Sequence, residues 1–187
     1  MAEKVCPFWV GYLLSSPIRK LWHNPETILA PYVAQGMKVL DIGCALGFFS
    51  FPLAKMVGQD GKVICVDIQE KMIRSLEKRA RKLGLLDRIE TRVCPTDSLR
   101  LENLDGGIDF ALAFAVVHEI LKPSVLFSEI YKALKPAGRL LIAEPIQRVS
   151  KRNFEDSIHT VQRCGFEIME RPHIRSTRAV LLQRQEQ

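Results

Sequence analysis

Short apolar runs alternate with helical patterns along this chain, and this alternation constrains the fold more than any other feature. The first clear pair is a strand pattern at residues 37–42, followed by a turn of small residues and a helical pattern that ends near Gly58. The same order recurs through five such units. Parallel neighbouring strands need a crossover between them, and the crossover is usually a helix. We therefore expect a doubly wound α/β fold.

The remaining segments agree with this fold. The other expected helices cover 25–34, 70–83, 123–134 and 154–163, and the other expected strands cover 63–67, 87–93, 106–120 and 139–144. Two final strand patterns, at 166–171 and 177–183, have no helix between them and should pair antiparallel. The sequence predicts a three-layer α/β/α sandwich with a seven-stranded, mostly parallel sheet that contains one antiparallel strand.

The bulk properties suit one domain of ordinary composition. The 187 residues allow a sizeable core, and the net charge of +6 permits an anionic partner without requiring one. The five cysteines are odd in number and widely spaced, which indicates free thiols in a reducing cytoplasm and no metal site. No run reaches the length of a membrane span. We expect a main domain over 25–187, preceded by a segment over 1–24.

The turn after the first strand carries the strongest functional signal. Asp41, Gly43, Ala45 and Gly47 occupy alternate positions where the strand meets the helix. Small residues let the backbone approach a ligand closely, and ligands of doubly wound sheets bind at the carboxyl ends of the strands. An acid here repels a pyrophosphate but suits an ammonium group. S-adenosylmethionine, which is cationic and has no phosphate, fits this requirement; the alternative is that Asp41 only braces the turn.

Asp67 favours the same ligand. It lies 20 residues after Gly47, at the end of the next expected strand. A carboxylate in that place can accept hydrogen bonds from both hydroxyls of a ribose. The alternative interpretation is a strand-end acid that caps the following helix.

Four segments resemble motifs of the class I S-adenosylmethionine-dependent methyltransferase family, and within it the small ubiquinone/menaquinone-biosynthesis-like group. They read VLDIGCALG, VICVDI, IDFALAFAVVHEI and LKPAGRLLIAEP, and the resemblance extends over residues 25–182. It implies S-adenosyl-L-methionine as the cofactor. The cofactor-binding residues that it implies are Asp41, Gly43, Cys44, Ala45, Gly47, Asp67, Ile68, Met72, Asp97, Ser98 and Phe114.

Two positions depart from the pattern of the family. Ala45 replaces the middle glycine of the loop, and we expect this to be tolerated provided that the backbone there does not need a positive φ. Asp97 stands a residue or two away from the place where the family often has an acid that contacts the adenine. The resemblance also suggests that aromatic residues of segment 1–24 cover the acceptor; packing against the helices is the alternative.

His118 and Glu119 stand at the carboxyl end of the fourth expected strand and are the candidate catalytic residues. A histidine there can orient a substrate or accept a proton, although the two residues can equally be a polar pair at a strand–helix junction. We expect methyl transfer to a small-molecule acceptor, whose identity and reacting atom the sequence leaves open. The alternatives are a non-catalytic cofactor-binding protein and an RNA methyltransferase. The basic run at 71–92 suggests RNA, but its interleaved acids favour a solvated helix face.

Overall fold

The structure is a computed structural model that describes residues 23–185, so the predicted N-terminal cover over 1–24 lies almost wholly outside the described residues. The chain divides into two compact units, Met1–Cys94 and Pro95–Gln187. Each unit contains strands joined by helices and has its own buried side chains. The units are described separately below.

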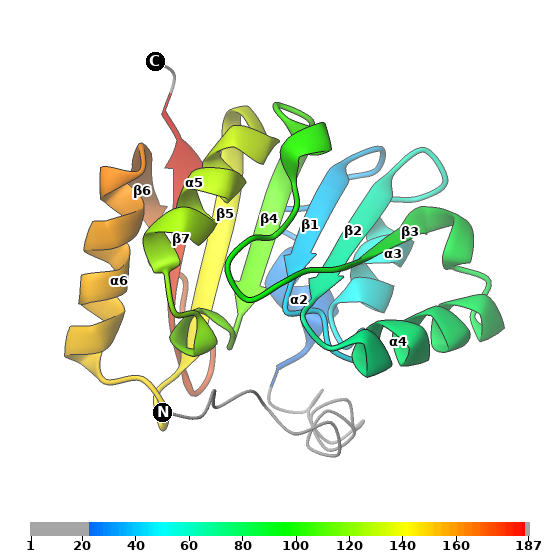
Figure 1. Ribbon diagram of the computed structural model, residues 1–187, viewed down its shortest axis with the longest axis horizontal. Helices are drawn as coiled ribbons and strands as arrows, with labels where there is room; N and C mark the ends of the chain where they lie inside the picture. Colours follow the sequence, from blue (N-terminus) through cyan, green and yellow to red (C-terminus); the bar gives the residue numbers. More distant parts are fainter. Residues whose placement is uncertain (1–22, 186–187) are drawn as a thin grey trace. The chain divides into compact units, whose positions relative to one another are not determined.

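The first unit contains parallel strands with helices packed on them (Figure 1). Its elements are α2 (Pro25–Leu29), β1 (Lys38–Ile42), α3 (Ser50–Met56), β2 (Lys62–Asp67), α4 (Glu70–Lys82), the 3₁₀ helix η2 (Leu86–Arg88) and β3 (Ile89–Val93). β2 pairs in parallel with β1 on one side and with β3 on the other. α3 contacts β2, and α4 contacts both β2 and β3.

Helix α2 is shorter than the helix predicted at 25–34. It begins as expected, because Asn24 is the N-cap and its side chain accepts a hydrogen bond from the Glu26 N–H at 3.0 Å. The helix ends at Leu29, and Pro31 follows two residues later. Proline has no N–H with which to continue the helical hydrogen bonds, and this explains the early end.

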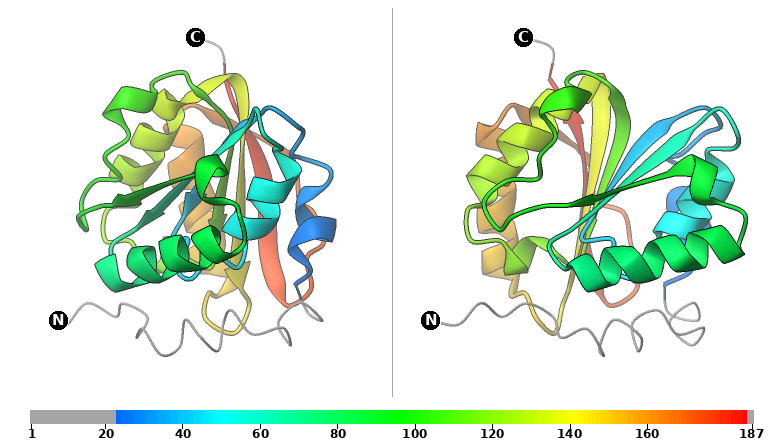
Figure 2. Two further views of the ribbon diagram at one scale, coloured as in Figure 1. Left: turned by 90° about the vertical axis from the view of Figure 1, so that its right-hand side faces the viewer. Right: turned by 45° about the vertical axis from the view of Figure 1, so that its right-hand side comes forward.

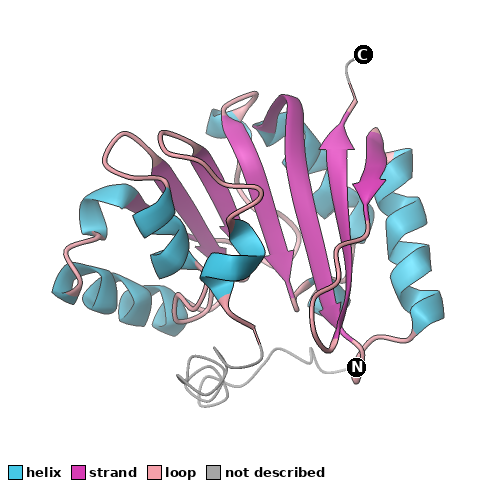
Figure 3. Ribbon diagram, turned by 180° about the vertical axis from the view of Figure 1, so that it is seen from behind, coloured by secondary structure: helices cyan, strands magenta, loops and turns pink. Residues whose placement is uncertain are grey.

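The second unit contains four strands, of which one is reversed. Its elements are η3 (Glu102–Leu104), β4 (Ile108–Phe114), η4 (Val117–Glu119), α5 (Pro123–Ala133), β5 (Leu134–Pro145), α6 (Lys151–Arg163), β6 (Phe166–Glu170) and β7 (Thr177–Arg184). β5 is parallel to β4, whereas β7 is antiparallel to both β5 and β6. Figure 3 shows the arrow of β7 opposite to those of its two neighbours. Figure 2 shows α5 and α6 next to each other, and the two helices are in contact.

Strand β5 is longer than predicted, because it begins at Leu134 and not at residue 139. Ile108 of β4 pairs with Leu134, but Phe110 pairs with Arg139, so the register shifts between them. β5 has extra residues at this point, as in a bulge. The predicted turn over 136–138 is therefore an irregular part of the strand, and Ala137 within it has a φ of 58°.

The seven described strands are ordered β3-β2-β1 in the first unit and β4-β5-β7-β6 in the second. The predicted fold class, a mostly parallel seven-stranded sheet flanked by helices, is confirmed. The predicted antiparallel pairing of the last two strands is also confirmed. Among residues 23–185, no helix has both the length and the apolar character needed to cross a membrane.

Candidate functional site

The loop between β1 and α3 has an unusual backbone conformation. Three of its residues have a positive φ, namely Gly43 at 68°, Ala45 at 46° and Gly47 at 86°. The N–H groups of Gly43 and Cys44 donate to the Val66 carbonyl at 2.8 and 3.1 Å. These bonds fix the start of the loop against the end of β2.

Ala45 does not meet the condition under which the sequence predicted that it would be tolerated. Its φ of 46° lies in the left-handed region, where a Cβ costs roughly 1–2 kcal/mol. The Ala45 N–H donates to Oδ2 of Asp67 at 3.0 Å, and this bond helps to hold the strained residue in place. The loop therefore accommodates an alanine at a conformational cost that glycine would not have.

Asp67 has acceptor positions that suit a sugar diol. It ends β2 and is 8% exposed. Its Oδ1 accepts a hydrogen bond from the Gln69 N–H at 2.8 Å, and its Oδ2 accepts the bond from Ala45. A carboxylate oxygen has about two acceptor positions, so each oxygen keeps one for a ligand hydroxyl. The residues present therefore fit the ribose of S-adenosylmethionine.

Two opposing effects act on the pKa of Asp67. Burial raises this pKa, because it disfavours the charged carboxylate. The backbone N–H groups of Gln69, Ala45 and Ile68 lower it, but burial is the larger effect and the pKa lies above its usual value. Hydroxyl donors from a bound diol favour the charged form, so we expect ligand binding and ionisation of Asp67 to reinforce each other.

Asp41 contacts the first residue of α3. Asp41 is 3% exposed, and its Oδ2 accepts a hydrogen bond of 2.5 Å from the Ser50 hydroxyl. The N-cap of α3 is Phe49, and Ser50 is the first helical residue, so Pro52 lies in the first turn of the helix, where the missing N–H of a proline is tolerated. This geometry favours the interpretation of Asp41 as a brace of the loop. Ser50 is the partner that sequence reasoning missed.

Arg79 and Phe51 support the loop from α4 and α3. A Cβ at Gly47 would lie 2.7 Å from the ring of Phe51, so the ring is packed against this glycine. The Arg79 guanidinium lies 5.1 Å from the centre of the same ring, and it donates a hydrogen bond to the Leu46 carbonyl. Sequence reasoning placed Arg79 on a solvated basic face. The structure corrects this, because the long side chain reaches back to the loop.

Cys44, Ile68 and Met72 complete the predicted cofactor residues of the first unit. Cys44 and Met72 are buried, whereas Ile68 is 37% exposed directly after β2. Burial is the main cause that raises the pKa of the Cys44 thiol, so this cysteine is a neutral packing residue. An exposed apolar residue beside Asp67 is the position from which contact with an adenine ring is expected.

Asp97, Ser98 and Phe114 belong to the second unit. Asp97 is exposed in a turn, and Phe114 is buried at the end of β4. The Ser98 hydroxyl donates to Glu129 of α5 at 3.3 Å, and the neighbouring Leu99 N–H donates to the same carboxylate oxygen at 2.8 Å. Glu129 therefore holds this segment on α5. The binding roles of Asp97, Ser98 and Phe114 remain predictions.

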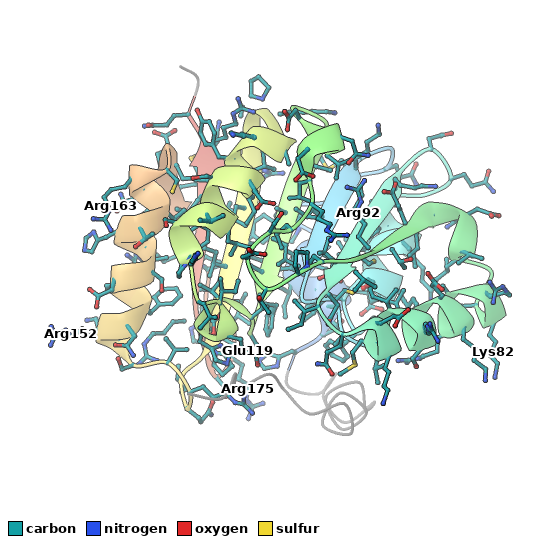
Figure 4. All side chains as sticks on the ribbon, viewed as in Figure 1. Lys82, Arg92, Glu119, Arg152, Arg163 and Arg175 are labelled. Carbon is teal, nitrogen blue, oxygen red and sulfur yellow. The ribbon has the colours of Figure 1, made fainter. Side chains whose placement is uncertain are left out.

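One of the two candidate catalytic residues, His118, contacts a second acid, Glu144. Oε2 of Glu144 lies 2.5 Å from Nδ1 of His118, and Oε1 of Glu119 lies 3.9 Å from Nε2 of the same ring. The Glu144 side chain is 2% exposed, and the side chains of His118 and Glu119 are 20% and 21% exposed. Glu119 lies at the lower end of the second unit in Figure 4.

Sequence reasoning missed Glu144, although a signal was present. The residue lies one position before the end of β5, as an acid after a buried apolar run. Asp41 and Asp67 occupy similar places at the ends of β1 and β2. An acid at the carboxyl end of a third buried strand was therefore a candidate of the same kind.

Comparisons with known proteins agree with this geometry. Residues 34–176 match the family described as a methyltransferase domain. A ubiquinone/menaquinone biosynthesis C-methyltransferase of Escherichia fergusonii is 31% identical over 158 residues, which make up 82% of this chain and 61% of that protein. The chain thus spans less than two thirds of the length of this relative.

Solved structures that are similar to this chain include SAM-dependent methyltransferases. A SAM-dependent methyltransferase from Aquifex aeolicus has a TM-score of 0.86 and 25% identity, and the match covers 96% of this chain and 99% of that one. A SAM-dependent methyltransferase from Mesorhizobium loti shares the fold, with a TM-score of 0.69, 16% identity and coverage of 86% and 96%. The family match includes more than half of the sequence, and this chain belongs to the class I S-adenosylmethionine-dependent methyltransferase family.

Proposed function

We propose that this protein transfers a methyl group from S-adenosylmethionine to a small-molecule acceptor. The observation that carries the proposal is the environment of Asp67, a strand-end carboxylate that is fixed by two backbone N–H groups and keeps one acceptor position on each oxygen. When bound, S-adenosylmethionine supplies a methyl group on a positively charged sulfur. The chain's own contribution is to position the reactants, which can supply much of the rate.

We assign separate roles in cofactor binding to four residues of the first unit. Asp67 accepts hydrogen bonds from the ribose hydroxyls. Gly43 and Gly47 let the loop backbone approach the ligand. Asp41, held by Ser50, keeps the loop in its conformation and adds negative charge near a cationic ligand. The group of the second unit around His118 is proposed to act on the acceptor.

A small molecule is favoured over RNA as the acceptor because the acids interleaved with the basic run over 71–92 pair with some of its arginines. Arg74 pairs with Glu70 at 2.7 Å, and Arg92 pairs with Glu90 at 2.6 Å. Arg79 donates to the loop. The relative from Escherichia fergusonii is named for the methylation of a carbon atom in a small-molecule pathway, which supports the same class of acceptor.

Calorimetry of S-adenosylmethionine binding tests the proposal. Replacement Asp67→Ala removes both acceptor oxygens, and we expect the affinity to fall at least tenfold, or about 1.4 kcal/mol. Asp67→Asn keeps one acceptor oxygen and should give an intermediate loss. Asp87→Ala, which removes an exposed acid of the same unit, serves as the matched control and should bind like the unchanged protein.

Two results would contradict the proposed function. The first is that the unchanged protein does not bind S-adenosylmethionine. The second is that a folded Asp67→Ala variant, checked by its melting temperature, binds with unaltered affinity.

A further inference from the structure

Arg79 differs from its basic neighbours on α4 in its surroundings. It is half-buried, whereas Lys78 and Arg81 are exposed. Its guanidinium donates a hydrogen bond to the carbonyl of Leu46, 33 residues earlier in the chain. It also lies 5.1 Å from the centre of the Phe51 ring, within the range of a cation–π contact. A long side chain loses rotamer freedom when it is held in this way, so these contacts must offset an entropic cost.

The hydrogen bond from Arg79 acts on one particular peptide group of the loop between β1 and α3. The Leu46 carbonyl belongs to the same planar peptide unit as the N–H of Gly47. Arg79 holds the carbonyl, and the N–H donates to the Cys44 carbonyl at 2.9 Å. The peptide unit is therefore fixed at both ends, and it can turn over only if both hydrogen bonds break.

Each part of this loop is held by a different element. Its first residues, 43–45, donate to the end of β2 through their N–H groups. Beyond the loop, the Ser50 hydroxyl ties the start of α3 to Asp41 of β1. The Leu46–Gly47 peptide lies between these two anchors, and α4 reaches it through Arg79. Without this side chain, the middle of the loop depends on the hydrogen bond of its internal turn and on apolar packing.

Helix α4 is a suitable base for such a contact, because it is itself anchored to its unit. Its Glu77 accepts a hydrogen bond from the Thr91 hydroxyl of β3. The buried side chains of the helix are Met72, Ile73, Leu76 and Ala80. Arg79 therefore projects from a fixed helix, and its contact can restrict the motion of the loop.

We propose that Arg79 is a positioning residue for the cofactor, which holds the Leu46–Gly47 peptide in the orientation that binding of S-adenosylmethionine requires. This role rests on the proposed function. Arg79 acts through the backbone of the loop. Its positive charge by itself opposes the approach of a positively charged sulfur. Removal of Arg79 would strengthen binding if its charge alone mattered, and weakens binding if positioning is its role.

Calorimetry of S-adenosylmethionine binding to Arg79 variants of the full chain tests this role. Arg79→Met keeps the aliphatic part of the side chain but removes the donor and the charge, and we expect the affinity to fall about fivefold or more. Arg79→Lys restores a donor and the charge, and it should recover part of the loss. Arg79→Gln is a second variant that disturbs the packing less. Its shorter side chain loses the reach of an arginine, and a fall in affinity is expected there too.

Arg88→Met is the matched control. Arg88 is also half-buried, and it donates to the Ala54 carbonyl in the second half of α3 at 3.4 Å. We expect Arg88→Met to lower the melting temperature as Arg79→Met does, but to leave the affinity within about twofold. An equal fall in affinity in both variants would assign the effect to the general stability of the unit, and would overturn the positioning role.

Nuclear magnetic resonance gives a readout of the peptide itself. In Arg79→Met without ligand, we expect the carbonyl carbon of Leu46 to change its chemical shift and the amide hydrogen of Gly47 to exchange faster. Both should stay unchanged in Arg88→Met. A folded Arg79→Met variant with unaltered signals at these two atoms, or with unaltered or higher affinity, would overturn the inference. A failure of the unchanged protein to bind S-adenosylmethionine would instead contradict the proposed function.

Discussion

The two units each place a carboxylate at the end of a buried strand, and they fix it in different ways. In the first unit, Asp67 receives one backbone hydrogen bond on each oxygen, from Ala45 and from Gln69. In the second unit, Glu144 receives two backbone hydrogen bonds on a single oxygen. Its other oxygen contacts the ring of His118.

This comparison shows that the distribution of backbone N–H donors determines which further hydrogen bonds a buried carboxylate can accept. Asp67 keeps one acceptor position on each of two oxygens, which suits a pair of neighbouring hydroxyls. Glu144 uses its second oxygen to contact the His118 ring, and this contact suits the orientation of a histidine. Both acids stand next to an alanine turn with a positive φ, at Ala45 and at Ala115. The residue types alone do not distinguish these two uses.

The largest loss of stability is expected from a substitution of Gly47, because this loop residue has a positive φ and packs against a ring. In Gly47→Ala, the φ of 86° and a contact of 2.7 Å with the Phe51 ring should together lower the free energy of unfolding by about 3 kcal/mol. Gly84→Ala is the matched control, because its φ is 66° and nothing lies within 4 Å of the added Cβ, so about 1 kcal/mol is expected.

Denaturant unfolding of the two glycine variants makes the measurement. Adding Phe51→Leu to Gly47→Ala should recover part of the loss, since a smaller side chain relieves the contact. If Gly47→Ala and Gly84→Ala lower the free energy of unfolding equally, the contact between Gly47 and the Phe51 ring does not contribute to stability.

A smaller effect is expected at Ser50, whose hydroxyl donates to the buried Asp41. Ser50→Ala removes this donor and should lower the free energy of unfolding by about 2 kcal/mol, because a buried acceptor loses a partner. Ser157→Ala removes a hydroxyl that is exposed on α6, and little change is expected there. A Ser50→Ala variant as stable as the unchanged protein would remove Asp41 from its bracing role.

The smallest effects are expected at the two alanines with positive φ. Ala45→Gly and Ala115→Gly both relieve left-handed strain, but glycine also has more freedom in the unfolded chain. We expect each to raise the free energy of unfolding by no more than about 1 kcal/mol, as measured by denaturant unfolding. A clear loss of stability in either variant would mean that its turn depends on the alanine side chain. Different changes in the free energy of unfolding for Ala45→Gly and Ala115→Gly would show that the two turns are strained to different degrees.

The sequence was sufficient for the fold class and for the positions of the first unit's candidate residues at the ends of its strands. Alternating strands and helices leave few topologies, and the spacing of Asp41, Gly43, Gly47 and Asp67 follows directly from the strand ends. The φ of Ala45 was not predictable in the same way. It depends on a hydrogen bond to an acid 22 residues further along the chain.

Long-range side-chain contacts account for the rest of what the sequence did not reveal. Arg79 resembles its neighbours on an amphipathic helix, but it reaches a carbonyl 33 residues away. Glu144 lies 26 residues from the ring that it holds. Such pairings depend on the arrangement of whole elements in space, and a local pattern of residue types does not contain that information.

The hydrogen bond between Ala45 and Asp67 has a consequence for the energetics of recognition. The carboxylate and the loop immobilise each other while the protein folds, before any nucleoside arrives. The torsional freedom lost in that step is not lost a second time when the ligand binds. Folding therefore orders the carboxylate and the loop in advance, and this preorganisation lowers the entropic cost of binding a ligand there.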